Sequence, residues 1–368
     1  MNEQAHQLKS LTHGNWFKLI CGASYQHLPA IRSLALAYSL AGADCIDVAA
    51  DKAVISAAQE GIAVAAKLRN AWQDTPSLKY SKPLLMVSLN DDEDPHFRKA
   101  EFDITQCPTD CPRPCETICP AGAINSLGVI DSLCYGCGRC LPICPQNLIS
   151  TRSYVSTPEI IIPWIKEMEI DAIEIHTQTG NFEQFKRLWQ AINPAVKQLK
   201  VLAISCPNNP HVINYMRSLY DLISPLPCPL IWQTDGRPMS GDIGAGTTHA
   251  AVKFAKKIID VDLPGYVQLA GGTNRYTITK LKSAGMLKNS PNDRYNNDFN
   301  RKKVSGVAYG SYARSLILPI LEQLETANYL DSQVNLANRT LENSPQLLQQ
   351  AVNKAHSLVT QIKTEVCQ

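Results

Sequence analysis

The segment CPTDCPRPCETICPAGAINSLGVIDSLCYGCGRCLPICP, residues 107–145, contains eight of the thirteen cysteines in a chain of 368 residues. Its second half has the spacing C-x2-C-x2-C-x3-C-P, with which bacterial-type ferredoxins hold a [4Fe–4S] cluster. Its first half has the looser spacing C-x3-C-x3-C-x3-C-P. The segment therefore predicts a bacterial-type two-[4Fe–4S] ferredoxin module, in which NSLGVID, residues 125–131, joins two similar halves.

The fourth cysteine of each run is expected to bind the cluster of the other run, as it does in two-cluster ferredoxins. One [4Fe–4S] cluster is then assigned to Cys119, Cys134, Cys137 and Cys140. The other is assigned to Cys107, Cys111, Cys115 and Cys144. A pair of zinc sites is the alternative, but zinc sites usually show two cysteine pairs separated by a longer gap, not triples followed by Cys-Pro.

Composition indicates the compartment in which these thiols function. The chain begins MNEQAHQLKS, which lacks the apolar core of a secretory signal, and no apolar stretch is long enough for a transmembrane segment. A cytoplasmic location is expected, where thiols stay reduced and bind metals more often than they form disulfides. The formal net charge of +2 includes no basic block, so nucleic-acid binding is not expected.

Outside the cysteine segment, short apolar runs alternate with stretches of helical periodicity. Eight such runs begin at residues 18, 45, 83, 172, 200, 229, 265 and 306. The alternation predicts an α/β fold, a (β/α)8 TIM-like barrel formed by residues 1–90 and 157–318. An open doubly wound sheet is the alternative, but no G-x-G-x-x-G follows a strand. Residues 319–368 are expected to form a C-terminal helical extension.

The cysteine module, residues 91–156, is predicted to be an insertion in the loop after the third barrel strand. That strand ends near Asn90, and the next helix begins where Ser156 or Thr157 can cap it. Loops that lead from strand to helix lie on the C-terminal face of such a barrel, which is the face that binds ligands. We therefore expect the ferredoxin-like module at the barrel mouth.

Strand alternation predicts which side chains point into the barrel. In AIEIHT the isoleucines face the surrounding helices, so Glu174 and His176 face inward, as does Asp47 from the second strand. These three residues are the candidate catalytic groups, and Arg275 or Arg314 is the expected partner of the carboxylates. A structural ion-pair network is the alternative that the sequence leaves open.

Glycine turns follow the last two strands, at Gly271 and Gly272 and at Gly310 and Ser311. In many barrels these loops hold a phosphate, so the four residues are candidates for binding a flavin or a phosphate-containing ligand. Ordinary tight turns are the alternative. The Gly-rich segment 235–247 is interpreted as a lid or as part of the same pocket, with a long surface loop as the alternative. No lysine is expected within a barrel strand, which argues against a Schiff-base aldolase.

A similarity to a known family rests on three stretches taken together. They are KLICGASYQHLPAIRSLALAYSLAGADCIDVAADKAVISAAQEGI, the two cysteine runs, and AIEIHTQTG after them. This combination resembles the light-dependent period protein family of cyanobacteria. The resemblance implies an iron–sulfur protein in the input to the circadian clock, which senses cellular redox state as a proxy for light. It also implies clock proteins and input kinases as partners.

Two classes of function remain. As a redox sensor, the protein would present a surface that a clock partner reads. As an oxidoreductase, it would pass electrons from an electron donor protein or a quinone, through the clusters, to a flavin or substrate at the barrel mouth. The resemblance favours the sensor, and the residues leave the enzyme open.

Overall fold

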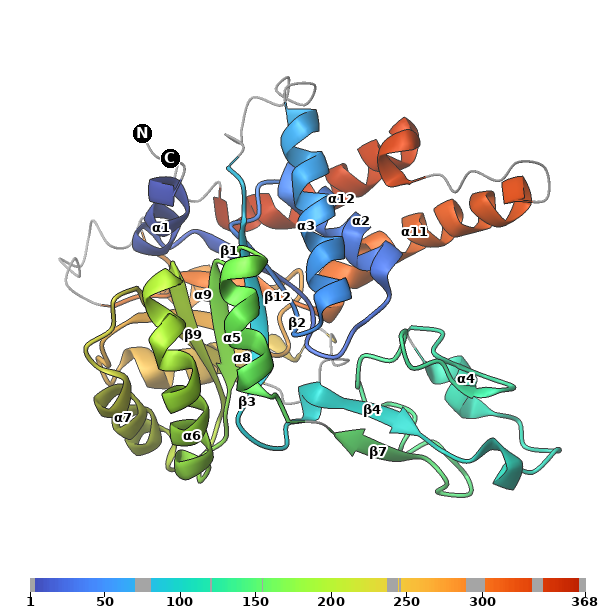
Figure 1. The fold of residues 1–368 in the computed structure, drawn as a ribbon, viewed down its shortest axis with the longest axis horizontal. Helices are drawn as coiled ribbons and strands as arrows, with labels where there is room; N and C mark the ends of the chain where they lie inside the picture. The colour runs from blue at the N-terminus through green and yellow to red at the C-terminus, as the bar shows by residue number, and fades with distance from the viewer. Residues whose placement is uncertain are drawn as a thin grey trace.

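Eight parallel strands close into a barrel in the order β1-β12-β11-β10-β9-β8-β3-β2, and helices surround it (Figure 1). The structure, a computed structural model, describes residues 4–69, 81–119, 121–153, 155–236, 244, 246–288, 302–332 and 340–363. The predicted (β/α)8 TIM-like barrel with an inserted cysteine-rich lobe is confirmed. Among the described residues, no helix combines the length and the apolar character needed to cross a membrane.

The barrel strands lie where the apolar runs predicted them. They are β1 (Trp16–Gly22), β2 (Cys45–Ala49), β3 (Leu84–Asn90), β8 (Ala172–His176), β9 (Val201–Pro207), β10 (Leu230–Asp235), β11 (Tyr266–Ala270) and β12 (Gly306–Tyr309). Almost every residue in them is buried, since helices cover one face and the barrel interior the other. Outward-facing side chains such as Ile173 and Ile175 join the main hydrophobic core.

Helices cover the outside of the barrel. They are α2 (Leu28–Leu40), α3 (Lys52–Leu68), α5 (Pro158–Glu167), α6 (Phe182–Ile192), α7 (Val212–Ile223), α8 (Thr248–Ile259), α9 (Thr277–Ser283) and α11 (Ser311–Ser332). At the N-terminal end of the barrel, α1 (Gln4–His13) places Leu11 in a cluster of buried side chains with Trp16, Met86 and Ile231. The chain ends in α12 (Pro345–Lys363), which packs on α2 and α11. The expected start of the extension, residue 319, lies inside α11.

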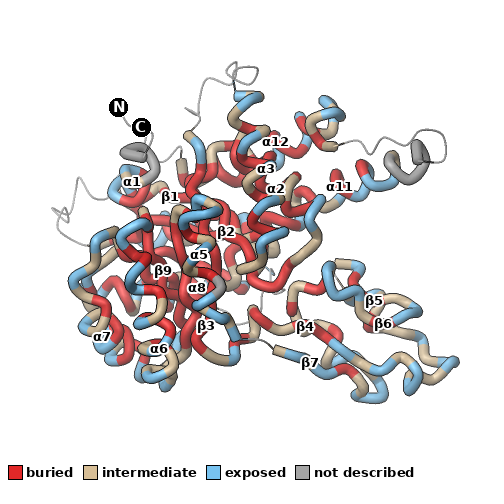
Figure 2. The backbone as a smooth tube through the Cα atoms, viewed as in Figure 1, coloured by how far each residue is buried: buried red, intermediate tan, exposed pale blue. Residues whose placement is uncertain are grey.

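The segment between β3 and α5 forms a separate lobe (Figure 1). Its elements are the antiparallel pair β4 (Arg98–Glu101) and β7 (Ser150–Ser153), the short helix α4 (Pro114–Ile118), and the hairpin β5 (Ile124–Asn125) and β6 (Gly128–Val129). Two short 3-10 turns also belong to the lobe, η2 (Pro95–Phe97) and η3 (Ile104–Gln106), and two others lie outside it, η4 (Asn193–Gln198) and η5 (Leu341–Asn343). Figure 2 shows far fewer buried residues in this lobe than in the barrel. Three of the seven side chains in its small buried core are cysteines, so metal binding is expected to stabilise it.

Polar contacts hold the lobe against the barrel. Asn90 and Ser156 hold together the two chain segments that connect the lobe to the barrel. The backbone N–H of Ser156 donates to Asn90 Oδ1 at 2.8 Å, and the backbone N–H of Asn90 donates to Ser156 Oγ at 3.0 Å. Ser156 therefore does not cap α5; Thr157 occupies the cap position without a side-chain hydrogen bond. Lys99 of the lobe is buried, and its Nζ donates at 2.6 Å to Oε1 of Gln26, which lies in the barrel loop before α2.

Candidate functional site

One cavity in the inserted lobe is lined by four cysteines from the two different runs. They are Cys119, Cys134, Cys137 and Cys140. The backbone N–H of Ala100 points at the sulfur of Cys134 at 3.4 Å, and that of Ala123 points at the sulfur of Cys119 at 3.2 Å. Four thiols around one cavity are the donor set that an iron–sulfur cluster requires, and N–H groups aimed at sulfur are among the features that set the potential of such a cluster. The residues present therefore fit such a group.

The other four cysteines also influence one another. Burial and then the neighbouring Cys111 raise the pKa of the Cys107 thiol, and Cys144 contributes to the raised pKa values of both Cys107 and Cys115. At Cys144, desolvation is outweighed by backbone N–H groups of residues 146–149, which lower the pKa of its thiol. A thiolate stabilised by N–H donors is ready to bind a metal. Both groupings are compatible with the crossed assignment, which stays a prediction.

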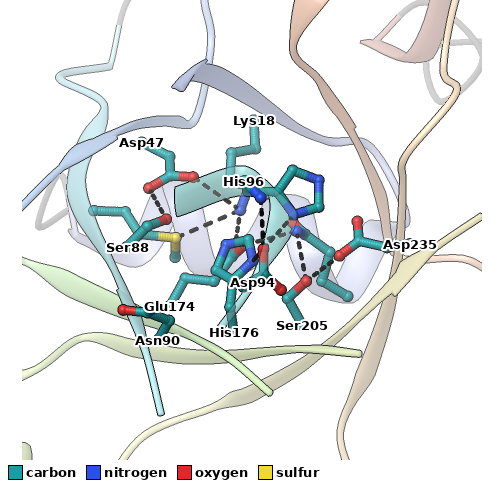
Figure 3. A network of polar contacts seen from close by, with 12 residues as sticks. Lys18, Asp47, Ser88, Asn90, Asp94, His96, Glu174, His176, Ser205 and Asp235 are labelled. Carbon is teal, nitrogen blue, oxygen red and sulfur yellow. Dashed lines mark hydrogen bonds and ion pairs between the residues drawn. The ribbon is translucent and has the colours of Figure 1, made fainter. Parts of the chain in front are cut away.

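Inside the barrel, Lys18 on β1 is fully buried between two carboxylates (Figure 3). Its Nζ forms an ion pair with Glu174 and a second with Asp47 at 3.5 Å. The expectation that no lysine lies within a barrel strand is therefore wrong. The strand begins at Trp16, before the predicted first residue, and this puts Lys18 at an inward-facing position within it.

The expected arginine partners of these carboxylates are also wrong. Arg314 donates instead to the carbonyl oxygens of Ile20 and Cys21, both at 3.0 Å. The guanidinium of Arg275 lies over the ring of Tyr276, 4.7 Å from its centroid. Both arginines lie beyond strand ends, whereas Lys18 reaches the carboxylates from inside the barrel.

Hydrogen bonds extend this ion-pair network around the interior. Gln233 Nε2 donates to Glu174 Oε1 at 2.6 Å, and Ser88 Oγ donates to Asp47 Oδ1 at 2.8 Å. Burial raises the pKa of Asp47 to about 6. Burial also opposes ionisation of Glu174, but Lys18 and then His176 lower its pKa to about 2. Glu174 is thus the ionised partner of Lys18, and this engagement supports a structural role for the pair.

His176, at the end of β8, is where the barrel interior meets the inserted lobe (Figure 3). Its Nε2 lies 3.0 Å from Glu174 Oε1, and its Nδ1 lies 3.9 Å from Asp94 Oδ1. Asp94 in turn lies 2.8 Å from Nδ1 of His96. Sequence reasoning missed Asp94 and His96; the available signal was the pattern Asp-x-His shortly after the end of a strand.

A cavity of about 60 Å³ lies at the barrel mouth. Its lining includes the four predicted ligand-binding positions Gly271, Gly272, Gly310 and Ser311 and two of the three candidate catalytic groups, Glu174 and His176, but not Asp47. This volume holds a few water molecules or a small anion. It is well below the roughly 300–1,000 Å³ of pockets for larger ligands. Residues 237–243 and 245 of the expected lid lie outside the described residues.

Tyr135 connects the two cavities. Its side chain lies between the cluster-binding loop and the barrel, and it lines both the cysteine cavity and the barrel-mouth cavity. The guanidinium of Arg314 lies 4.5 Å from the centroid of the Tyr135 ring. Tyr135, next to Cys134 in sequence, therefore belongs to the wall of both cavities.

Comparisons with known proteins give two kinds of match. A family model described as "Light dependent period A C-terminal domain" matches residues 164–361, and one described as "LdpA Fe-S cluster-binding domain" matches residues 107–155. A curated protein from Synechococcus elongatus, named "Light dependent period A", is 48% identical over 359 residues, which cover 98% of this chain and 94% of the relative. The second model agrees with the cysteine geometry and supports an iron–sulfur cofactor.

Among solved structures, the chain is similar to (S)-3-O-geranylgeranylglyceryl phosphate synthase from Thermoplasma acidophilum, with a TM-score of 0.38, 11% identity, and coverage of 97% of this chain and 99% of that one. It is also similar to fructose-bisphosphate aldolase from Campylobacter jejuni, with a TM-score of 0.41, 8% identity, and coverage of 97% and 92%.

Proposed function

The chain belongs to the light dependent period A family, and on this premise we propose that it is an iron–sulfur redox sensor in the input to a circadian clock. The observation that carries the proposal is the cavity lined by Cys119, Cys134, Cys137 and Cys140, one cysteine from the first run and three from the second. When bound, clusters of this kind take up and release single electrons, at potentials set by hydrogen bonds and solvent exposure.

We propose two [4Fe–4S] clusters with crossed ligands, as in two-cluster ferredoxins. Anaerobically reconstituted protein is expected to contain about eight iron and eight sulfide ions per chain. Cys119→Ala and Cys134→Ala are expected to change the EPR signal of the same cluster, while Cys111→Ala changes that of the other. Two zinc ions per chain would exclude iron–sulfur clusters, and separate effects of the first two variants would exclude the crossing.

Exposed apolar side chains on the inserted lobe support a role in partner recognition. Five of the seven large hydrophobic side chains that are exposed in the described part of the chain belong to this lobe: Ile118, Leu127, Ile130, Ile143 and Val155. Two of them, Ile118 and Ile143, directly precede cluster cysteines. Contiguous exposed apolar surface is typical of protein interfaces, and we propose that these side chains contribute to one. A clock protein that packs here would lie beside the cysteines and respond to their state.

The sensor proposal is tested by the period of the rhythm. We would replace the Synechococcus elongatus relative with this chain and record a luminescent reporter at several light intensities. The wild-type chain is expected to support a period that varies with light, whereas Cys134→Ser combined with Cys144→Ser is expected to give a period independent of light. A double variant that tracks light as the wild type does would exclude sensing through the clusters.

A second candidate function, an oxidoreductase, is favoured by the position of Tyr135 between the cysteine cavity and the barrel mouth. The small cavity favours a phosphate-sized anion over a flavin, with Gly271, Gly272 and Ser311 as its neighbours and Arg314 as the cation. Mass spectrometry of the purified protein distinguishes the two functions. A bound phosphate-containing ligand or other small substrate would support the enzyme, and its absence together with a light-dependent period would support the sensor.

A further inference from the structure

We propose that Asp94, His96 and His176 form a mononuclear binding site for a divalent transition-metal ion, in addition to the cysteine sites. The three side chains can each offer one ligand atom, and these atoms all lie within 4.8 Å of one another. Two histidines and one carboxylate are a set that binds Zn²⁺ or Fe²⁺ with positions left open for water or a ligand.

The site is assembled from two parts of the fold. His176 ends β8 of the barrel, whereas Asp94 and His96 belong to the first turn of the inserted lobe, around η2. Asp94 is held in place by the backbone N–H of His96, which donates to its Oδ1 at 2.8 Å. A metal ion bound here would join the lobe to the rim of the barrel, so its binding would fix the position of the cluster-binding lobe.

The surroundings of His176 resemble the outer shell of a metal site. Its Nε2 lies 3.0 Å from Glu174 Oε1 and its Nδ1 faces Asp94, so an ion bound at Nδ1 would leave the Nε2 N–H to donate to Glu174. Histidine ligands of metals commonly donate their second ring N–H to a carboxylate in this way. Glu174 is itself held by Lys18 and by Gln233. The buried ion-pair network thus orients His176 through Glu174.

The position also leaves room for a further ligand. His96, His176 and Asp235 line the barrel-mouth cavity of about 60 Å³, which can hold water molecules beside the ion. Phe97 packs its ring against His176, with centroids 5.2 Å apart in an edge-on arrangement, and limits the rotation of the imidazole. All three proposed ligands are at least four-fifths buried as side chains. Burial, fixed orientation and an adjacent cavity distinguish this group from exposed clusters of polar residues.

Zn²⁺ is the probe that tests the site. The full-length, cluster-loaded protein would be dialysed anaerobically with Zn²⁺, and zinc, iron and sulfide would be counted per chain. One zinc ion is expected in addition to an unchanged iron content. Its X-ray absorption is expected to show only nitrogen and oxygen neighbours at about 2.0–2.2 Å, without the sulfur neighbours at about 2.3 Å that cysteine binding would produce.

Variants assign the site. His96→Gln and Asp94→Asn are each expected to weaken zinc binding by more than the roughly 10–100-fold that loss of an outer-shell partner costs. His249→Gln, on the exposed side of α8, is the matched control and is expected to bind zinc as the wild type does. His176→Gln gives the same test from the barrel side. If that buried substitution prevents folding, the two loop variants still decide the outcome.

Either of two results would overturn the proposal. The first is zinc with sulfur neighbours, which would place the ion on the cysteines. The second is an affinity that His96→Gln and Asp94→Asn leave unchanged. Because iron and sulfide are counted separately, failure of this site is distinguishable from failure of the cluster assignment.

Discussion

Replacing Glu174 with glutamine tests whether the buried ion-pair network stabilises the barrel. Glu174 and Lys18 are both 0% exposed, so the lysine has no access to water. In Glu174→Gln it keeps only Asp47, at 3.5 Å, as a carboxylate partner. Removal of one member of a buried ion pair usually costs about 3–5 kcal/mol, because the remaining charge is left uncompensated.

The remaining contact with Asp47 places the expected loss at the lower end, about 3 kcal/mol. For a chain of this size each kcal/mol lowers the melting temperature by about 2 °C, so a decrease of about 6 °C is expected. The measurement is far-UV circular dichroism of anaerobic, cluster-loaded protein without added divalent metal. The iron content is expected to stay unchanged, because the cysteines lie in the separate lobe.

Glu183→Gln is the matched control, because Glu183 is 78% exposed and its carboxylate lies 4.0 Å from Nζ of Lys186 in a surface ion pair. Such pairs contribute about 0–1 kcal/mol, so this variant is expected to melt within about 2 °C of the wild type. If Glu174→Gln melts with the control, the conclusion that Lys18 depends on Glu174 is refuted. In that case Lys18 and Glu174 do not stabilise each other. The double variant Lys18→Met with Glu174→Gln should then lose at least as much free energy of unfolding as the two single variants together.

Three further predictions concern the same two parts of the molecule. Burial raises the pKa of Asp47 to about 6, so the stability that its protonated form contributes is present at low pH and is lost as pH rises through 6. Asp47→Asn should remove this titration, so urea unfolding between pH 4 and pH 8 should show a smaller loss of stability in the variant than in the wild type, and an equal loss would contradict this. Gly136 has φ +69°, and a Cβ there would lie 2.1 Å from the Arg98 carbonyl oxygen. Gly136→Ala should therefore displace the loop that carries the cysteines and lower the iron content, and an unchanged iron content would contradict this. Gly272, at φ +93°, lines the barrel-mouth cavity. Gly272→Val should weaken phosphate binding, measured by calorimetry, while the iron content stays constant. An affinity for phosphate equal to that of the wild type would show that this loop is not part of the site.

Much of the fold could be predicted from local patterns. Apolar runs located all eight barrel strands, because a strand covered on both faces must be nearly continuously apolar. The position of the cysteine runs between the third and fourth strands placed the inserted lobe at the barrel mouth, since strand-to-helix loops share one face. Alternation also predicted that Glu174 and His176 face inward, since side chains on a strand point to opposite sides in turn.

The partners of those side chains depended on the tertiary structure. The pairing of Lys18 with Glu174 joins residues 156 positions apart, and it depends on the closure of the barrel and on where β1 begins. The approach of His96 to His176 depends on how the lobe folds back over the rim, and so does the place of Tyr135 between the two cavities. Periodicity and spacing are properties of a few consecutive residues, so they determine elements and ligand sets. Which charged group meets which is decided by the register and packing of distant segments, and these are set by the free energy of the whole fold.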